Sequence, residues 1–149
     1  MSQYVHMVRW VRIGLVYEAV SAALIGLWAL PAPRSFFDDF PGILGMNWAS
    51  AAGPYNEHYV RDVGALYLGF VVLFVWAARQ PVRLATPVAA AWALVQLPHL
   101  VFHLAHDENL TRWEWATQGF GLAAVLAVAV AIALAGRNLS ETGSATASR

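Results

Sequence analysis

Apolar residues form four long runs along the chain, separated by polar segments of different lengths. The runs cover about residues 11–30, 57–78, 84–105 and 113–136. At a rise of about 1.5 Å per residue, a helix over each run reaches about 30 Å, the thickness of a hydrocarbon core. The first run could also be a cleaved signal peptide, but Glu18 in its middle and its length favour a retained span. The pattern predicts an all-α, four-helix antiparallel transmembrane bundle that forms one domain.

The polar segments predict how the four helices are connected. The first connection, about residues 34–57, contains S-F-F-D-D-F-P-G, with Ser35 as a candidate N-cap and Pro41-Gly42 as a stop. Its aromatic residues fit a short interfacial helix at the extracytoplasmic surface. The second connection, at Gln80 and Pro81, is tight, so runs two and three should be antiparallel neighbours. Residues 137–149 are rich in Ser, Thr and Ala, which predicts a disordered cytoplasmic tail.

The composition agrees with a membrane protein and excludes several other classes. Of the 149 residues, 59% are hydrophobic and 12% are charged, and the mean hydropathy is +0.52. The charged fraction is about half of the ~25% that soluble domains contain. The net charge is zero and no basic block stands out, so nothing indicates nucleic-acid binding. Because there is no Cys, disulfides, thiolate metal sites and cysteine nucleophiles are excluded.

The arginines predict the orientation in the membrane. One side of the four runs carries Arg9, Arg12, Arg79, Arg83 and Arg137, and the other side carries Arg34 and Arg112 among Asp38, Asp39, Asp107 and Glu108. The positive-inside rule therefore places both termini in the cytoplasm of a multi-pass plasma-membrane protein. The lipid bilayer is the expected partner. A homo-oligomer and a membrane-protein partner both remain open.

Small residues recur at helical spacing and predict which faces pack. The first run has Gly14, Glu18, Ala22 and Gly26 on one face, the second has His58, Asp62, Ala65 and Gly69, and the fourth has Ala123, Ala127, Ala131 and Ala135. Such stripes allow close approach of helices, so we expect all three to face inward. Glu18 would then point into the bundle, with Gln96 as the nearest polar group in depth. It could contact a ligand or a proton there, or be a protonated side chain hydrogen-bonded to Gln96 or Tyr17.

The end of the third run is the strongest candidate for chemistry. It reads Q-L-P-H-L-V-F-H-L-A-H, which places Gln96, His99, His103 and His106 on one helical face. If runs two and three are antiparallel neighbours, His99 and His103 lie at the depth of Asp62, and His58 lies nearer the surface. Three imidazole nitrogens and one carboxylate oxygen are a suitable ligand set for Zn²⁺ or another divalent metal. The sequence therefore predicts a metal site at the extracytoplasmic ends of these runs.

Neighbouring residues extend the predicted site. Glu57 would be the available general base beside a metal-bound water, and Asn56, Glu57 and Arg61, together with Glu18 and Gln96, are candidate ligand-binding residues. A haem between His58 and His103 or His106 fits less well, since all three lie near the surface. The same residues could equally pair with one another to fix the helix ends. Whether the protein is an enzyme stays open.

Three motifs carry a resemblance to known membrane proteins. P-R-S-F-F-D-D-F-P-G, P-Y-N-E-H-Y-V-R-D-V-G and P-H-L-V-F-H-L-x-H resemble a group of small actinobacterial four-helix membrane proteins of unassigned function. More distantly, the chain is similar to the DoxX-like proteins, where an R-D-x-G-like turn also opens a span. The resemblance covers the first three runs and the first connection. It implies a four-helix bundle in the plasma membrane and brings no activity with it.

Two functional hypotheses follow. The first is a site for a divalent metal or a small lipid-like ligand, open to the outer leaflet and covered by the first connection. The second is a non-catalytic membrane subunit or scaffold whose polar cluster is structural, because buried ionisable clusters also arise for structural reasons.

Overall fold

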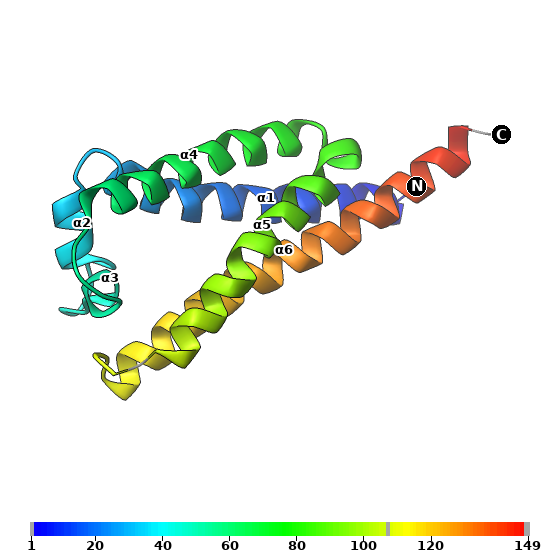
Figure 1. Ribbon diagram of the computed structural model, residues 1–149. Coiled ribbons are helices and arrows are strands. Elements are labelled where there is room, and N and C mark those ends of the chain that lie inside the picture. Colours follow the sequence, from blue (N-terminus) through cyan, green and yellow to red (C-terminus); the bar gives the residue numbers. More distant parts are fainter. Residues whose placement is uncertain (1, 107, 148–149) are drawn as a thin grey trace.

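The computed structural model of the protein describes residues 2–106 and 108–147, which form helices joined by loops. The four long helices are α1 (Ser2–Ala29), α4 (Glu57–Arg79), α5 (Pro81–Ala105) and α6 (Arg112–Ala147). Two short helices, α2 (Pro33–Asp39) and α3 (Trp48–Ala51), lie between α1 and α4 (Figure 1). All four long helices are long and apolar enough to cross a membrane. The predicted fold class is confirmed, and the chain is a multi-pass membrane protein.

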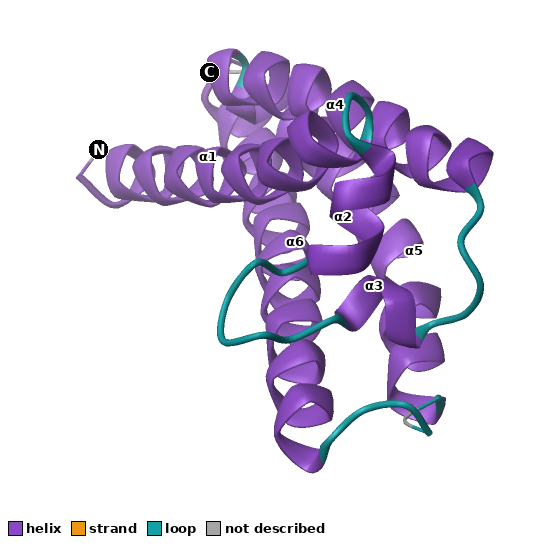
Figure 2. Cartoon of the chain, turned by 90° about the vertical axis from the view of Figure 1, so that its left-hand side faces the viewer, coloured by secondary structure: helices purple, strands orange, loops and turns teal. Residues whose placement is uncertain are grey.

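The long helices pack as two antiparallel pairs, α1 with α4 and α5 with α6. Figure 1 shows that the two pairs cross obliquely and that both chain ends lie at the same end of the bundle. At the opposite end the pairs diverge, and α2 and α3 lie in the opening between them (Figure 2). Asn109, just before α6, donates to the carbonyl oxygen of Ala51 in α3 over 3.1 Å, which ties the two pairs together across this opening.

Close backbone contacts at small residues select these pairs. A Cβ atom added at Gly64 of α4 would lie 2.6 Å from the backbone nitrogen of Leu30, next to α1. In the other pair, a Cβ at Gly136 of α6 would lie 2.7 Å from Oγ1 of Thr86 in α5. The Thr86 hydroxyl also donates to the carbonyl oxygen of Ala133 over 3.1 Å. Because only glycine permits these approaches, α4 packs most closely on α1 and α5 on α6, instead of α4 and α5 on each other.

The inward face of α1 is as the small-residue stripe predicts. Glu18 and Ala22 are fully buried, and Gly26 is buried against Leu68 of α4. The first predicted stripe is therefore confirmed, and it carries the carboxyl group into the interior of the bundle.

The predicted inward faces of the other two helices are wrong. His58, Asp62, Ala65 and Gly69 are exposed on α4, and Ala123, Ala127 and Ala131 are exposed on α6. The buried face of α4 carries Gly64, Tyr67, Phe70, Phe74 and Ala77, and α6 buries Ala129, Ile132 and Leu139. Large aromatic and aliphatic side chains bury more apolar surface than alanine does, so they decide the rotation of these helices.

Several helix ends also differ from the prediction. Helix α1 begins at Ser2 instead of Val11, because no proline or glycine interrupts the chain before Gly14. Helix α2 begins at Pro33, a favourable first residue, and Ser35 is not its cap. Helix α6 continues to Ala147, through most of the segment predicted to be disordered; residues 148 and 149 of that segment lie outside the described residues.

Candidate functional site

Four polar or amphipathic side chains meet where α1, α4 and α5 come together, and we call them the central cluster. They are Glu18 of α1, Tyr67 of α4, and Trp92 and Gln96 of α5. Glu18 has 0% of its surface exposed and Gln96 has 3%. The indole N–H of Trp92 donates to Oε2 of Glu18 over 3.0 Å. The Gln96 side chain lies beside the Tyr67 hydroxyl, so the cluster brings three helices together.

Two acceptor atoms of this cluster have no hydrogen-bond partner among the described residues. They are Oε1 of Glu18 and Oε1 of Gln96. The ion pairs of the described chain all lie elsewhere, so no basic side chain neutralises Glu18. A buried polar atom without a partner is costly in a membrane, where water is scarce. The two oxygens can accept hydrogen bonds from the hydroxyl or N–H groups of a bound molecule, or a neutral Glu18 can donate to Gln96.

Aromatic rings surround the polar groups on the α4 side. Trp92 lies edge-on to Tyr67 and Phe74, with ring centroids 5.1 and 5.5 Å away, and 4.6 Å from Phe70. Trp92 and Phe74 are almost completely buried. These rings exclude water from the Glu18 carboxyl group, and hydrogen bonds are stronger where water is excluded.

A surface groove lies beside the central cluster, between α1 and α4. This α1/α4 groove has a volume of about 490 Å³ and is lined almost entirely by apolar side chains, with Arg79 at one end. Its walls include Leu15 and Ala19, which flank Glu18 along α1, and Phe74, which contacts Trp92. Ligand pockets commonly have volumes of about 300–1,000 Å³, so the groove could take a hydrocarbon chain.

The predicted metal site is not formed. His58 and Asp62 pair with each other on the exposed face of α4, with Nε2 3.3 Å from Oδ2. His99 and His103 contact each other on α5, with ring centroids 4.7 Å apart. Among residues 2–106 and 108–147, no three His, Asp or Glu side chains come together in an arrangement that could hold a metal ion. The four predicted zinc ligands are therefore not brought together in the described chain, and the haem alternative stays a prediction.

The physical reason is the packing of the helices. The tight turn at Gln80 does hold the ends of α4 and α5 together, as predicted, but the helices diverge from this turn (Figure 1). Helix α5 packs along α6, and α2 and α3 occupy the space between the start of α4 and the end of α5 (Figure 2). The aromatic face of α4 also turns His58 and Asp62 away from the interior.

The remaining predicted residues at this end stabilise the start of α4. Oδ1 of Asn56 accepts from the backbone N–H of Tyr59 over 3.3 Å, which makes Asn56 the N-cap. The Arg61 guanidinium lies 2.8 Å from Oε1 of Glu57 and also donates to the carbonyl oxygen of Leu30. The candidate base Glu57 is thus paired with Arg61.

Other polar groups at this end pair locally as well. Nδ1 of His106 lies 2.9 Å from the carbonyl oxygen of Phe102, one turn before it. In α2, the hydrogen bond from Arg34 to Asp38 raises the pKa of the Arg34 guanidinium above its ordinary value. His103 lies beside Gln118 of α6, which is 4% exposed.

Sequence reasoning found Glu18 and Gln96 but missed Trp92, Tyr67 and Gln118. A signal for Trp92 was present, because it precedes Gln96 by one helical turn and so shares its face. Tyr17, the predicted alternative partner of Glu18, is exposed instead. No comparable pattern marked Tyr67 or Gln118 as polar neighbours.

Comparison with known proteins gives a family and no activity. No curated protein and no solved structure matches the chain. The likeness to DoxX-like proteins therefore stays a prediction. A model of the family described as "Domain of unknown function (DUF4345)" matches residues 10–97, more than half of the chain, and this range includes all of the central cluster. The chain belongs to the DUF4345 family.

Proposed function

We propose that this membrane protein binds a small amphiphile whose hydroxyl groups donate to the central cluster. The observation that carries the proposal is the pair of buried oxygens, Glu18 Oε1 and Gln96 Oε1, that have no donor in the described chain. Unpaired buried polar atoms are rare in folded proteins and call for an explanation. Two hydroxyl groups of one bound molecule would satisfy both atoms without bringing a charge into the membrane.

The α1/α4 groove supplies a route to the cluster from the lipid. The apolar tail of the amphiphile would lie along Leu15 and Ala19, and its polar end would pass Phe74 to reach Glu18. Phe74 separates the groove from Trp92, so rotation of its ring would open the path. Ionisable side chains within membrane spans commonly mark such sites.

The bilayer is the medium from which the ligand comes. With five arginines at the end of the bundle that holds both termini, we propose a plasma-membrane location with the termini in the cytoplasm. The mouth of the groove at Arg79 then faces the inner leaflet.

A second candidate is a non-catalytic scaffold in which the central cluster only holds the helices together. It is favoured by the hydrogen bond from Trp92 to Glu18, which links α5 to α1 directly. A neutral Glu18 that donates to Gln96 would complete the cluster with no ligand. The two candidates differ in whether a donor from outside the chain is needed.

Binding of two matched probes separates the candidates. One is a monoacylglycerol with a brominated chain, which carries two hydroxyl donors, and the other is the methyl ester of the same acid, which carries none. Bromine quenches tryptophan fluorescence on contact, and a Trp92→Phe variant identifies the quenching that comes from the cluster. We expect wild-type protein to bind the monoacylglycerol about tenfold more tightly than the ester, as for one or two buried hydrogen bonds.

Substitution of each acceptor tests the assignment. Glu18→Leu and Gln96→Leu should each remove most of the preference for the monoacylglycerol, whereas Asp62→Asn on the exposed face of α4 should leave it unchanged. Equal binding of the two probes by folded wild-type protein would favour the scaffold instead. The Gln96→Leu variant keeps the bond from Trp92 to Glu18 and therefore serves if Glu18→Leu does not fold.

A further inference from the structure

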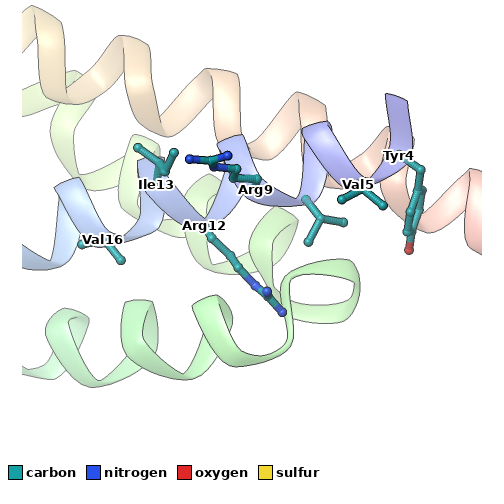
Figure 3. Close-up of a pocket in the computed structure, with 7 residues that line it drawn as sticks. Tyr4, Val5, Arg9, Arg12, Ile13 and Val16 are labelled. Carbon is teal, nitrogen blue, oxygen red and sulfur yellow. The ribbon is translucent and has the colours of Figure 1, made fainter. Parts of the chain in front are cut away.

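We propose that the first half of α1 carries a binding site for an anionic phospholipid. The site is a second groove, of about 580 Å³, lined by apolar side chains together with Arg9 and Arg12 (Figure 3). Its apolar wall includes Val5 and Ile13. The lipid phosphate would lie at the two guanidinium groups and an acyl chain along the apolar wall. This proposal does not depend on the function proposed for the central cluster.

The charges of the groove are complementary to a phosphate. Its lining contains two arginines and no acidic residue. Arg9 has no hydrogen-bond or ion-pair partner in the described part of the chain. Arg12 uses its Nε, which donates to the carbonyl oxygen of Ala78 over 3.2 Å, so its terminal nitrogens remain available. Guanidinium groups bind phosphate oxygens in pairs, with geometry that a lysine does not provide.

The position of Arg12 concentrates charge where two grooves meet. Arg12 extends from α1 towards the turn between α4 and α5, whereas Arg9 lies along α1 near Ile13 (Figure 3). Ala78, the partner of Arg12, is followed by Arg79 at the end of the α1/α4 groove. Val16 lines both grooves. The arginines at this junction therefore border apolar surface for an acyl chain on each side.

The rival explanation for Arg9 and Arg12 is that they only add to the positive charge that orients the protein in the membrane. Arg83 and Arg137 lie at the same end of the bundle but line neither groove. Arg137 pairs with Glu141 at 3.1 Å. These two arginines are therefore matched controls, because they share the charge and the end of the bundle but lack the groove.

Competition between two lipids tests the site in the full-length protein. Delipidated protein is mixed with equal amounts of phosphatidylglycerol and phosphatidylcholine of the same acyl chains, and the bound lipids are counted by native mass spectrometry. A hydrogen bond from a guanidinium group to a phosphate favours the bound lipid about tenfold. We expect Arg9→Gln to lower the preference for phosphatidylglycerol about tenfold, and Arg9→Gln/Arg12→Gln about 100-fold.

The controls make each outcome decisive. Arg83→Gln/Arg137→Gln should keep the wild-type preference, and an equal loss in this variant would overturn the site in favour of general charge. Retention of the preference by Arg9→Gln/Arg12→Gln would also overturn it. Glycerol phosphate in excess should not displace the lipid, and displacement would indicate a site for free phosphate instead. Arg9→Gln removes no hydrogen bond or ion pair within the described chain, so its effect on lipid does not depend on a change of fold.

Discussion

The central cluster and the N-terminal turns of α4 use similar side chains in opposite ways. Glu18 is fully buried and bonds across helices to Trp92, whereas His58 pairs with Asp62 one turn further along α4. The side chains of His58 and Asp62 are 78% and 62% exposed. Exposed ion pairs contribute about 0–1 kcal/mol, while loss of a buried partner costs about 1–3 kcal/mol. Burial, more than residue type, therefore decides which polar group organises this protein.

The largest effect is expected at the glycine on which the α1–α4 pair depends. Gly64→Leu forces a side chain against the backbone of Leu30, which cannot move aside as a side chain could. We expect a loss of about 3 kcal/mol in the free energy of unfolding, at the upper end for overpacked sites. Gly69→Leu is the matched control, since its Cβ would meet nothing within 4 Å. Denaturation in mixed micelles measures both, and similar losses would contradict the pairing.

The second prediction compares the loss of the buried carboxyl group of Glu18 with the loss of the exposed carboxyl group of Asp62. Glu18→Ala leaves the Trp92 indole N–H buried without an acceptor, so we expect it to lower the free energy of unfolding by about 2 kcal/mol. Asp62→Ala removes an exposed pair and should cost less than about 0.5 kcal/mol. The same denaturation experiment compares the two variants. A larger effect for Asp62 would reverse the comparison between the regions.

A double-mutant cycle isolates the hydrogen bond that joins α1 to α5. Unfolding of Glu18→Ala, Trp92→Phe and the double variant should give a coupling free energy of about 1.5 kcal/mol. The corresponding cycle for His58→Ala and Asp62→Ala should give about 0.3 kcal/mol, because both side chains are exposed. No coupling between Glu18 and Trp92 would mean that the bond does not link the helices in solution.

The smallest effect concerns the contact between the start of α4 and the end of α1. Arg61→Met removes the donor to the Leu30 carbonyl oxygen and should cost about 1 kcal/mol. Glu57→Gln weakens only the ion pair with Arg61 and should cost about 0.3 kcal/mol. Hydrogen exchange of the backbone amides between Pro31 and Asn56 provides the readout. We expect this exchange to become faster in Arg61→Met alone. Equal exchange in both variants would exclude this role of Arg61.

The four helices could be predicted because their signal is local. An apolar run of 20 residues or more identifies a span whatever it packs against, and the stripe of Gly14, Glu18, Ala22 and Gly26 faces inward as predicted. Glu18 and Gln96, which were predicted at similar depth, are both buried near Tyr67. These inferences need only the rise per residue and the direction of each helix.

The metal site could not be predicted reliably from the sequence, because it depends on which helices pair and on how each helix is rotated. The tight turn at Gln80 indicated that α4 and α5 are neighbours, but Gly64 and Gly136 hold them against α1 and α6. The rotation of α4 follows from its aromatic residues packing on Trp92, a contact over long sequence distance. A histidine pattern on one helix therefore gave no information on what it faces.

A high-resolution crystal structure of wild-type protein grown from lipid tests the central claim most directly. Our account predicts a bound molecule with a hydroxyl oxygen about 3 Å from Oε1 of Glu18 or of Gln96. Direct contact between these two oxygens, with no bound molecule beside them, would contradict it.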